Sequence, residues 1–370
     1  MGRHDPGSWA DLDESDVRVR ANKKGSRPRT KERPAYDDAL SARIVTVDRG
    51  RYTAILEEGA DDERLVVAVR AKQLRRTPIV AGDLVDLVGD TSGAPDTLAR
   101  LVRLEPRTTL LRRSADDTDP VERAVVANAD RLVVVVAAAE PAPRTGFIDR
   151  SLVAAYDAGI EPLLVITKTD LADPAPLIEH YRALELAVLT SATAAGSCAA
   201  RPAGAHETLP LDPALVDALR EKLRGSISVV LGHSGVGKST LVNALTGADR
   251  ATGGVNAVTG RGRHTSSSAL ALRLPDSPTG SWIIDTPGVR SFGLAHVEPD
   301  RIVEAFDELA PAIAACAKGC THLVQAPGCA LDSWVAEGRA GPAGAQRLSS
   351  LRRLLGAGHD AEADAKSLGV

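Results

Sequence analysis

A glycine-rich segment in the second half of the chain carries the residue types that bind nucleotide phosphates. Residues 232–239 match G-x-x-x-x-G-K-[ST] in full, between an apolar run typical of a strand and a run typical of a helix. Glycines let successive N–H groups face a phosphate, and the lysine and serine reach its oxygens and its Mg²⁺. The predicted phosphate-binding residues are Gly232, His233, Ser234, Gly235, Val236, Gly237, Lys238, Ser239 and Thr240.

A second motif, Asp285-Thr286-Pro287-Gly288, follows the apolar residues 282–284. A carboxylate at the end of the strand beside a phosphate loop holds Mg²⁺. An Asp-x-x-Gly tetrapeptide alone is usually a turn, but this one lies 47 residues after Lys238 and directly after an expected strand. We therefore expect Asp285 and Ser239 to bind Mg²⁺, and the N–H of Gly288 to meet a γ-phosphate.

A candidate reader of the base follows an apolar strand expected at 162–166. In GTPases an Asn-Lys-x-Asp motif does this work, because its carboxylate accepts two N–H groups that guanine offers and adenine does not. Thr-Lys-Thr-Asp here also makes a good turn into a helix, but its place at a strand end favours the base reader. A Ser-Ala pair after the next strand resembles the companion element for guanine O6. The predicted base-binding residues are Thr167, Lys168, Thr169, Asp170, Ser191 and Ala192.

The order of these motifs along the chain is unusual. Ordinary GTPases place the base reader last, whereas here it precedes the phosphate loop and the Asp285 motif. This order predicts a circular permutation of the GTPase domain. The segment after Gly288 then leads directly into the C-terminal region.

Cysteines and a histidine cluster near the C-terminus. Cys316, Cys320, His322 and Cys329 form C-x₃-C-x-H-x₆-C and include three of the four cysteines of the chain. Three thiolates and one imidazole fill the tetrahedral shell of Zn²⁺, which leaves no open position for catalysis. The clustering predicts one structural zinc ion rather than disulfides, and unmetallated buried thiols are the alternative.

The elements that must position these motifs fall into three groups. Five β-rich runs predict a small barrel or a β-sandwich, and a barrel of OB or SH3-like type is equally compatible with them. Alternating strands and helices then predict a parallel, doubly wound α/β sheet, after an Arg- and Asp-rich connector at 108–122. The runs of the first group are 42–47, 52–57, 65–70, 83–88 and 97–104. The strands of the second are 131–139, 162–166, 187–190, 226–231 and 282–284, and its helices are 149–158, 176–184, 213–223 and 239–245.

Composition limits the classes of function. The 370 residues carry a net charge of −4, yet residues 18–33 hold eight Lys or Arg and one Glu, which predicts a disordered basic tail over 1–38. Such an arm either binds phosphate backbones or is a solvated tail without a partner. Aromatic residues are only 3%, which disfavours recognition by base stacking. No signal peptide or membrane span is evident, so a cytoplasmic protein is expected, and nothing demands more than a monomer.

Together these features resemble the RsgA family of circularly permuted GTPases. The resemblance covers roughly residues 40–355 and includes Gly82-Asp83-Leu84-Val85 in the barrel and Gly262-Arg263-His264-Thr265 after the phosphate loop. It implies an OB-fold at 39–108, a permuted GTPase domain at 122–294 and a helical zinc-binding domain at 295–370. It also implies binding to the small ribosomal subunit and its rRNA late in maturation, with GTP hydrolysis to GDP that the subunit stimulates.

Residues that depart from the GTPase pattern limit what the resemblance implies. Thr167 stands where the family usually has Asn, so weaker contacts to the purine or to the phosphate loop are expected. Val289 occupies the place of a water-orienting Gln and cannot polarise water. His264 is therefore the predicted catalytic residue, although a contact to rRNA phosphate or packing in its loop are alternatives. By resemblance Thr265, or else Ser266, would ligate Mg²⁺.

Other functions remain compatible with the sequence. An ATPase is one alternative, because Thr167 replaces the Asn of the guanine-reading motif. A nucleotide-gated rRNA-binding module whose hydrolysis is incidental and a permuted GTPase of the large subunit are further alternatives. The final helix expected at 345–355 carries Arg347, Arg352 and Arg353, which predict either a second RNA contact or a solvated face.

Overall fold

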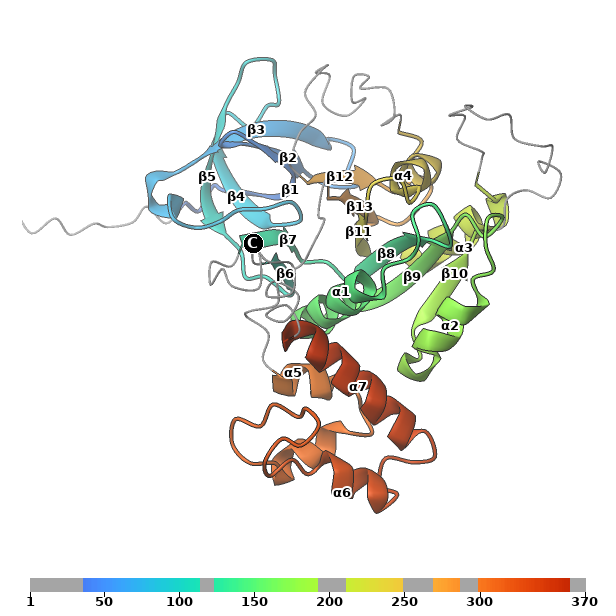
Figure 1. The fold of residues 1–370 in the computed structure, drawn as a ribbon. Coiled ribbons are helices and arrows are strands. Elements are labelled where there is room, and N and C mark those ends of the chain that lie inside the picture. The colour runs from blue at the N-terminus through green and yellow to red at the C-terminus, as the bar shows by residue number, and fades with distance from the viewer. Residues whose placement is uncertain (1–35, 114–122, 192–210, 249–268, 287–298, 360–370) are drawn as a thin grey trace, which may run out of the picture. The chain divides into compact units, whose positions relative to one another are not determined.

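The computed structural model describes residues 36–113, 123–191, 211–248, 269–286 and 299–359 (Figure 1). Residues 357–359 are described by their backbone alone. The basic tail, Ala192, His264, Thr265 and Gly288 lie outside these ranges. Within them no helix combines the length and the apolar composition that crossing a membrane requires.

Five strands near the N-terminus close into a barrel (Figure 1). Their order is β1-β2-β3-β5-β4, and β4 returns to pair with β1. β3 and β5 are parallel, whereas the other neighbours are antiparallel. Closure excludes the β-sandwich that the strand pattern alone allowed. The strands are β1 Leu40–Asp48, β2 Arg51–Leu56, β3 Arg64–Arg70, β4 Leu84–Gly89 and β5 Ala99–Leu104, each within two residues of the predicted range, and a short 3₁₀ turn, η3 Lys72–Leu74, follows β3.

The predicted connector after the barrel is wrong in part, because it contains a strand. β6 (Leu110–Arg113) pairs antiparallel with β7 (Arg123–Ala127) in a two-stranded ribbon. Only Leu111 of β6 is buried, so the exposed arginines beside it dominate the sequence pattern. The ribbon is joined to the barrel where the N–H of Ala127 donates to the carbonyl of Ala81 at 3.1 Å.

The α/β part contains a six-stranded section in the order β10-β9-β8-β11-β13-β12. All neighbouring pairs are parallel except β12 with β13. β12 was not predicted, and Thr46 of β1 pairs with Leu270 of β12, so the barrel continues the same sheet. The strands are β8 Arg131–Ala137, β9 Glu161–Thr167, β10 Ala187–Thr190, β11 Ile227–Gly232, β12 Leu270–Arg273 and β13 Trp282–Asp285.

Helices cover both faces of this sheet, as the alternating pattern predicted. α1 and α2 share one core with the side chains of Leu132 and Val134 of β8, whereas α3 and α4 share another with Val133 and Val135. Alternate residues of a strand point to opposite faces, so these two cores are the two sides of one doubly wound sheet. The helices are α1 Thr145–Ala158, α2 Ala175–Tyr181 with the 3₁₀ turn η4 Arg182–Leu184, α3 Pro213–Leu223 and α4 Lys238–Thr246.

The C-terminal region is helical and packs on α1. Leu351 and Leu354 of α7 are buried in the same core as Ile148 and Leu152 of α1. The region forms no separate core of its own among the described residues. Its elements are α5 Pro299–Glu304, the 3₁₀ turn η5 Ala310–Ala315, α6 Leu331–Ala336 and α7 Gly344–His359.

The three arginines of α7 do not form the solvated face that was one of the two alternatives for them, because each meets a protein partner. Arg347 is ion-paired with Glu308 and donates to the carbonyl of Ala183 at 2.9 Å. Arg352 forms a bidentate pair with Asp332, with contacts of 2.7 and 2.8 Å. Arg353 lies 3.4 Å from a carboxylate oxygen of buried Asp149 in α1. These side chains hold the C-terminal region to its surroundings.

Glu58, in the loop after β2, joins the barrel to the hairpin of β12 and β13. Its Oε1 accepts from the indole N–H of Trp282 at 2.7 Å and from the N–H of Gly280 at 2.9 Å. Its Oε2 accepts from Arg43 of β1 at 3.1 Å. One half-buried carboxylate therefore connects two parts of the sheet that are more than 200 residues apart in sequence.

A candidate nucleotide site and a candidate metal centre

The predicted nucleotide motifs lie at one edge of the sheet. β8, β9, β11 and β13 are parallel neighbours, so their carboxyl ends meet at the same side. β9 ends at Thr167, β11 ends at Gly232, and β13 ends at Asp285. Ligands of open α/β sheets bind at this edge, where strand order reverses.

The loop after β11 has the geometry of a phosphate cradle. Gly235 and Gly237 have φ values of +83° and +89°, a region that L side chains rarely adopt. Gly232 tolerates no side chain either, because a Cβ there would lie 2.8 Å from the carbonyl oxygen of Val135. Gly237 is the N-cap of α4, so the positive end of this nine-residue helix is directed at the site.

Two charged residues of the motifs meet each other in the site. Nζ of Lys238 is ion-paired with Asp285 and also donates to the carbonyl of Thr286 at 3.2 Å. Both charged side chains are largely buried. A nucleotide would compete for Lys238 and Mg²⁺ for Asp285, so binding must exchange this pair for contacts to phosphate and metal. Ser239 and Thr240 begin α4 beside it.

The base-reading strand contacts the phosphate loop directly. Oγ1 of Thr167 lies 2.6 Å from the carbonyl oxygen of Val236, which is 69 residues away in sequence. The side chain is 1% exposed. The structure thus brings together two motifs that the sequence only placed at neighbouring strand ends.

The rest of the base reader is held by two neighbouring loops. Lys168 has φ +54°, and its Nζ donates to the carbonyl of Glu140 in the loop after β8. The Thr169 hydroxyl donates to the carbonyl of Ser191, and its N–H reaches the same oxygen at 3.3 Å. Asp170 follows in the same turn. Ser191 is therefore beside the base reader, as predicted.

His233 is the histidine of the phosphate loop. Its ring meets Phe147 of α1 edge-on, with ring centroids 4.2 Å apart. Burial, together with the nearby Arg144 guanidinium, lowers the pKa of His233 below its ordinary value. The neutral imidazole is therefore favoured at pH 7.

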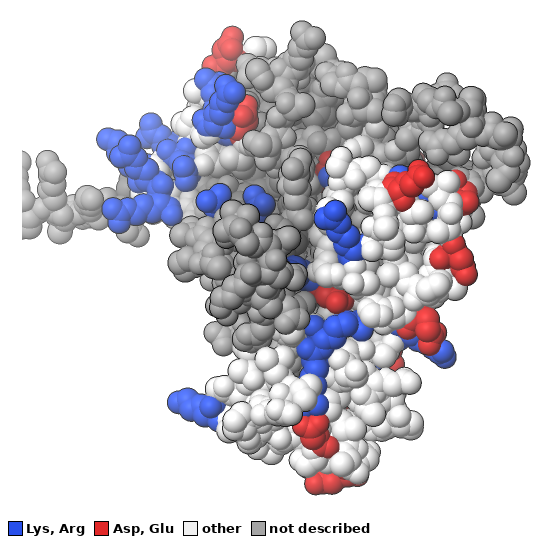
Figure 2. All heavy atoms as spheres, in the orientation of Figure 1, with Lys and Arg blue, Asp and Glu red and all other residues white. Residues whose placement is uncertain are grey.

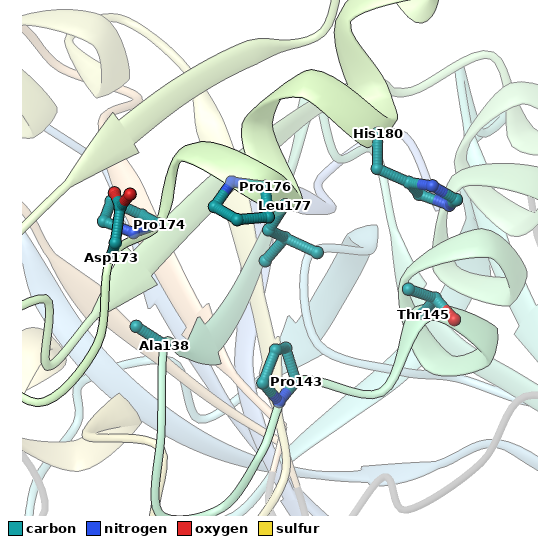
Figure 3. Close-up of a pocket in the computed structure, with 8 residues that line it drawn as sticks. All are labelled: Ala138, Pro143, Thr145, Asp173, Pro174, Pro176, Leu177 and His180. Carbon is teal, nitrogen blue, oxygen red and sulfur yellow. The ribbon is translucent and has the colours of Figure 1, made fainter.

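A pocket of about 290 Å³ adjoins the base-reading strand (Figure 3). Ala138, Pro143 and Thr145 line it from the loop after β8 and the start of α1, and five residues between 173 and 180 line it from α2 and the turn before it. Its lining is mainly apolar and contains none of the predicted nucleotide-binding residues. This pocket is therefore distinct from the nucleotide motifs.

The four predicted metal ligands come together in the loop between η5 and α6. One ligand atom from each of Cys316, Cys320, His322 and Cys329 lies within 4.8 Å of all the others. Nδ1 of His322 lies 3.7 Å from Sγ of Cys316 and 3.9 Å from Sγ of Cys329. Ligand atoms of a tetrahedral zinc site are about 3.5–3.8 Å apart, so the arrangement fits a metal ion.

Groups around the cluster are arranged for thiolates and a neutral imidazole. The N–H groups of His322 and Ala330 point at Sγ of Cys320 and of Cys316, at 3.4 and 3.3 Å. Burial raises the pKa of the Cys316 and Cys320 thiols, so a cation is required to hold both as thiolates at neutral pH. Nε2 of His322 lies 2.7 Å from Oδ1 of Asp300, which leaves Nδ1 as the ligand atom.

Comparison with known proteins gives the family. A family model described as RsgA GTPase matches residues 104–295. A Pseudomonas aeruginosa protein named "Small ribosomal subunit biogenesis GTPase RsgA" is 37% identical over 285 residues, which cover 75% of each chain. The chain belongs to the RsgA GTPase family. A protein of the same name from Pseudomonas syringae pv. tomato is 38% identical over 285 residues, covering 75% of this chain and 74% of that protein.

Solved structures have the fold of this RsgA-family chain. YjeQ from Thermotoga maritima matches with a TM-score of 0.57 and 23% identity, covering 87% of this chain and 99% of that one. YloQ, described as a circularly permuted GTPase, matches with a TM-score of 0.56 and 20% identity, covering 88% and 97%. The likeness confirms the permuted GTPase fold that follows an N-terminal barrel.

Sequence reasoning missed the residues that support the site. Nothing in the sequence distinguishes Asp300 or Glu58 from other carboxylates, because their partners are remote in the chain. Asp83 of the Gly82-Asp83 pair was noted only for its resemblance to the RsgA family. It is fully buried and bound by both arms of the Arg107 guanidinium, at 2.7 and 2.8 Å. A charged residue between apolar ones in a strand pattern is the one signal that could have identified it.

Proposed function

We propose that the chain hydrolyses GTP during biogenesis of the small ribosomal subunit and that the subunit stimulates this hydrolysis. The observation that carries the proposal is the joining of the base-reading strand to the phosphate loop through Thr167 and Val236 at the carboxyl edge of the sheet. Membership of the RsgA GTPase family supports GTP as the nucleotide. Two relatives of this family carry small-subunit biogenesis in their names.

The residues of the site divide the chemistry among them. The phosphate loop and Lys238 would bind the β- and γ-phosphates, and Ser239 and Asp285 would hold Mg²⁺, which neutralises charge on the transferred group. Asp170 would accept the two guanine N–H groups that adenine lacks. Thr265 as a further Mg²⁺ ligand and His264 as the group that holds the attacking water complete the proposal, and both lie outside the described residues.

The barrel is proposed to be an OB-fold that contacts rRNA. Its five strands, their order and the parallel pairing of β3 with β5 support this assignment. Figure 2 shows basic side chains gathered over the barrel end of the molecule. A basic surface binds the phosphate backbone without reading base sequence, in keeping with the scarcity of aromatic residues. Exposed basic residues of the barrel include Lys72, Arg75, Arg76, Arg100 and Arg103.

The metal is proposed to be one structural Zn²⁺ held by Cys316, Cys320, His322 and Cys329. Soft thiolate donors with one imidazole in a closed tetrahedral set favour zinc over Mg²⁺ or Ca²⁺. The proposed domain limits remain 39–108, 122–294 and 295–370, and the proposed place of action is the cytoplasm, where ribosomal subunits mature.

The proposal is tested by GTP turnover with purified full-length protein alone and with isolated small or large ribosomal subunits. We expect slow turnover alone, acceleration by the small subunit only, and displacement of bound GTP by GDP but not by ATP. Lys238→Ala serves as the inactive control. Equal competition by ATP would contradict guanine specificity. Equal acceleration by the large subunit would contradict the assignment of the partner.

A further inference from the structure

The last residue of β9 is where the chain departs from the Asn-Lys-x-Asp pattern of GTPases. Two carbonyl oxygens lie near Oγ1 of Thr167, that of Val236 at 2.6 Å and that of Val136 at 3.1 Å. A threonine hydroxyl has one hydrogen to donate. The shorter contact takes this hydrogen, so the hydroxyl has none left for a nucleotide base.

The contact to Val236 determines how the phosphate loop presents its backbone. In a trans peptide the C=O and the N–H point in opposite directions. A Val236 carbonyl held toward β9 therefore directs the N–H of Gly237 away from the strand. Gly237 is the N-cap of α4, so this N–H is one of the unpaired donors at the helix start that a phosphate can accept.

The side chain of Thr167 packs closely against the phosphate loop, which favours this one orientation of the Val236 carbonyl. A Cβ placed on Gly237 would lie 3.7 Å from Oγ1 and 3.8 Å from Cγ2 of Thr167, which is ordinary contact distance. The backbone of the loop thus lies directly on the threonine side chain. The base-reading strand and the phosphate loop are therefore in direct contact at this point.

We propose that Thr167 is a positioning residue that orients the phosphate loop and gives no hydrogen bond to the base. This inference rests on the GTP binding proposed above. The amide of an Asn has two N–H hydrogens, one for the loop carbonyl and one for an acceptor on the base. Guanine N7 is such an acceptor, and a committed hydroxyl cannot donate to it. Guanine is then read by Asp170 and by backbone N–H groups.

The positioning role is tested by binding of GTP and GDP to Thr167→Val and Thr167→Ser in the full-length protein. Valine keeps the shape and removes the hydroxyl, and we expect about tenfold weaker affinity for both nucleotides. Serine restores the hydroxyl and is expected to bind within about twofold of wild type. Thr246→Val is the matched control, because the Thr246 hydroxyl also donates to a backbone carbonyl, that of Val242 at 2.7 Å, but at the far end of α4 from the phosphate loop.

The outcomes separate this role from simple stability. Thr167→Val and Thr246→Val should both lower Tm, but only the first should weaken nucleotide binding. A Thr167→Val protein with lowered Tm and unchanged affinity would overturn the inference. A wild-type protein that bound no guanine nucleotide would instead overturn the proposed function.

The base contact is tested with 7-deaza-GTP, which lacks the N7 acceptor. Wild-type protein is expected to bind GTP and 7-deaza-GTP within about twofold of each other, whereas Thr167→Asn should prefer GTP. A wild-type preference for GTP of about tenfold or more, or a Thr167→Asn protein without preference, would overturn this part of the proposal.

Discussion

At the scale of single residues, both candidate sites depend on polar contacts that fix the positions of their functional groups. Lys238 with Asp285, Thr167 with Val236 and His322 with Asp300 each join residues from different elements. A buried polar group without a partner destabilises a protein by about 1–3 kcal/mol. Removing one member of such a pair therefore affects both folding and binding.

Asp300 offers a residue-scale prediction about the metal. Asp300→Asn should weaken Zn²⁺ binding about 10–100-fold, because the carboxylate orients His322 and increases the basicity of its ring. Competition with a chromogenic chelator measures the affinity. Asp307→Asn, an exposed carboxylate in the segment that follows α5, is the control. Equal zinc affinity in the two variants would mean that Asp300 does not support the metal.

His233 makes stability depend on pH. Its pKa is lowered in the folded protein, so the unfolded chain binds a proton more readily as pH falls below about 6.5. This residue therefore contributes a loss of folding stability in acid and none above pH 7. His233→Gln should reduce the difference between the free energies of unfolding measured in urea at pH 7.5 and pH 5. If the difference between the two free energies of unfolding stayed the same, His233 would not be its source.

At the scale of elements, Gly82 is where the barrel meets β7. A Cβ at this position would lie 2.1 Å from the carbonyl oxygen of Ala127, and the φ of Gly82 is +89°. The residue also accepts a hydrogen bond, because Nδ2 of Asn128 donates to its carbonyl at 3.0 Å. Close approach of two backbones, rather than turn conformation alone, is why glycine is required here.

A pair of glycine substitutions separates these two effects. Gly89 also has φ +89°, but a Cβ there meets nothing within 4 Å. Gly89→Ala should lower the free energy of unfolding by about 1–2 kcal/mol, the cost of the left-handed backbone. Gly82→Ala should lower it by at least ~2 kcal/mol more, because the backbones at positions 82 and 127 must also move apart. Urea unfolding measures both, and equal losses would show that the close approach relaxes easily.

At the scale of the whole molecule, the described barrel and GTPase sheet share strand pairing and Glu58. β12 follows the segment that contains His264, and β13 leads to Asp285, so the barrel is attached to the hairpin between two nucleotide motifs. The proposed contact between rRNA and the barrel would therefore act on the site through this hairpin.

Glu58→Ala tests whether this connection stabilises the molecule. We expect the free energy of unfolding to fall by about 2–4 kcal/mol, because Arg43 and the indole of Trp282 lose their acceptor. Tryptophan fluorescence in urea reports the loss near Trp282. Asp61→Ala, an exposed carboxylate of the same loop, should change stability by less than about 0.5 kcal/mol. Equal midpoints for the two variants would exclude a structural role for Glu58.

Motifs whose chemistry depends on local spacing could be predicted from the amino-acid sequence. The phosphate loop, the base reader ahead of it and the Cys and His cluster are each contiguous or nearly so, and strong apolar runs predicted the strands that carry them. Short strands were missed at Leu110–Arg113, Arg123–Ala127 and Leu270–Arg273, because at most two residues of each are buried and periodicity needs a longer run.

Which polar groups meet each other could not be predicted from the sequence and is seen only in the folded chain. Thr167 contacts Val236 across 69 residues, Glu58 contacts Trp282 across 224, and the arginines of α7 meet protein carboxylates instead of forming a solvated face. In sequence, a carboxylate or an arginine looks the same whether water or a buried partner satisfies it. The physical reason is that such partners are chosen by the packing of distant elements, which no local pattern records.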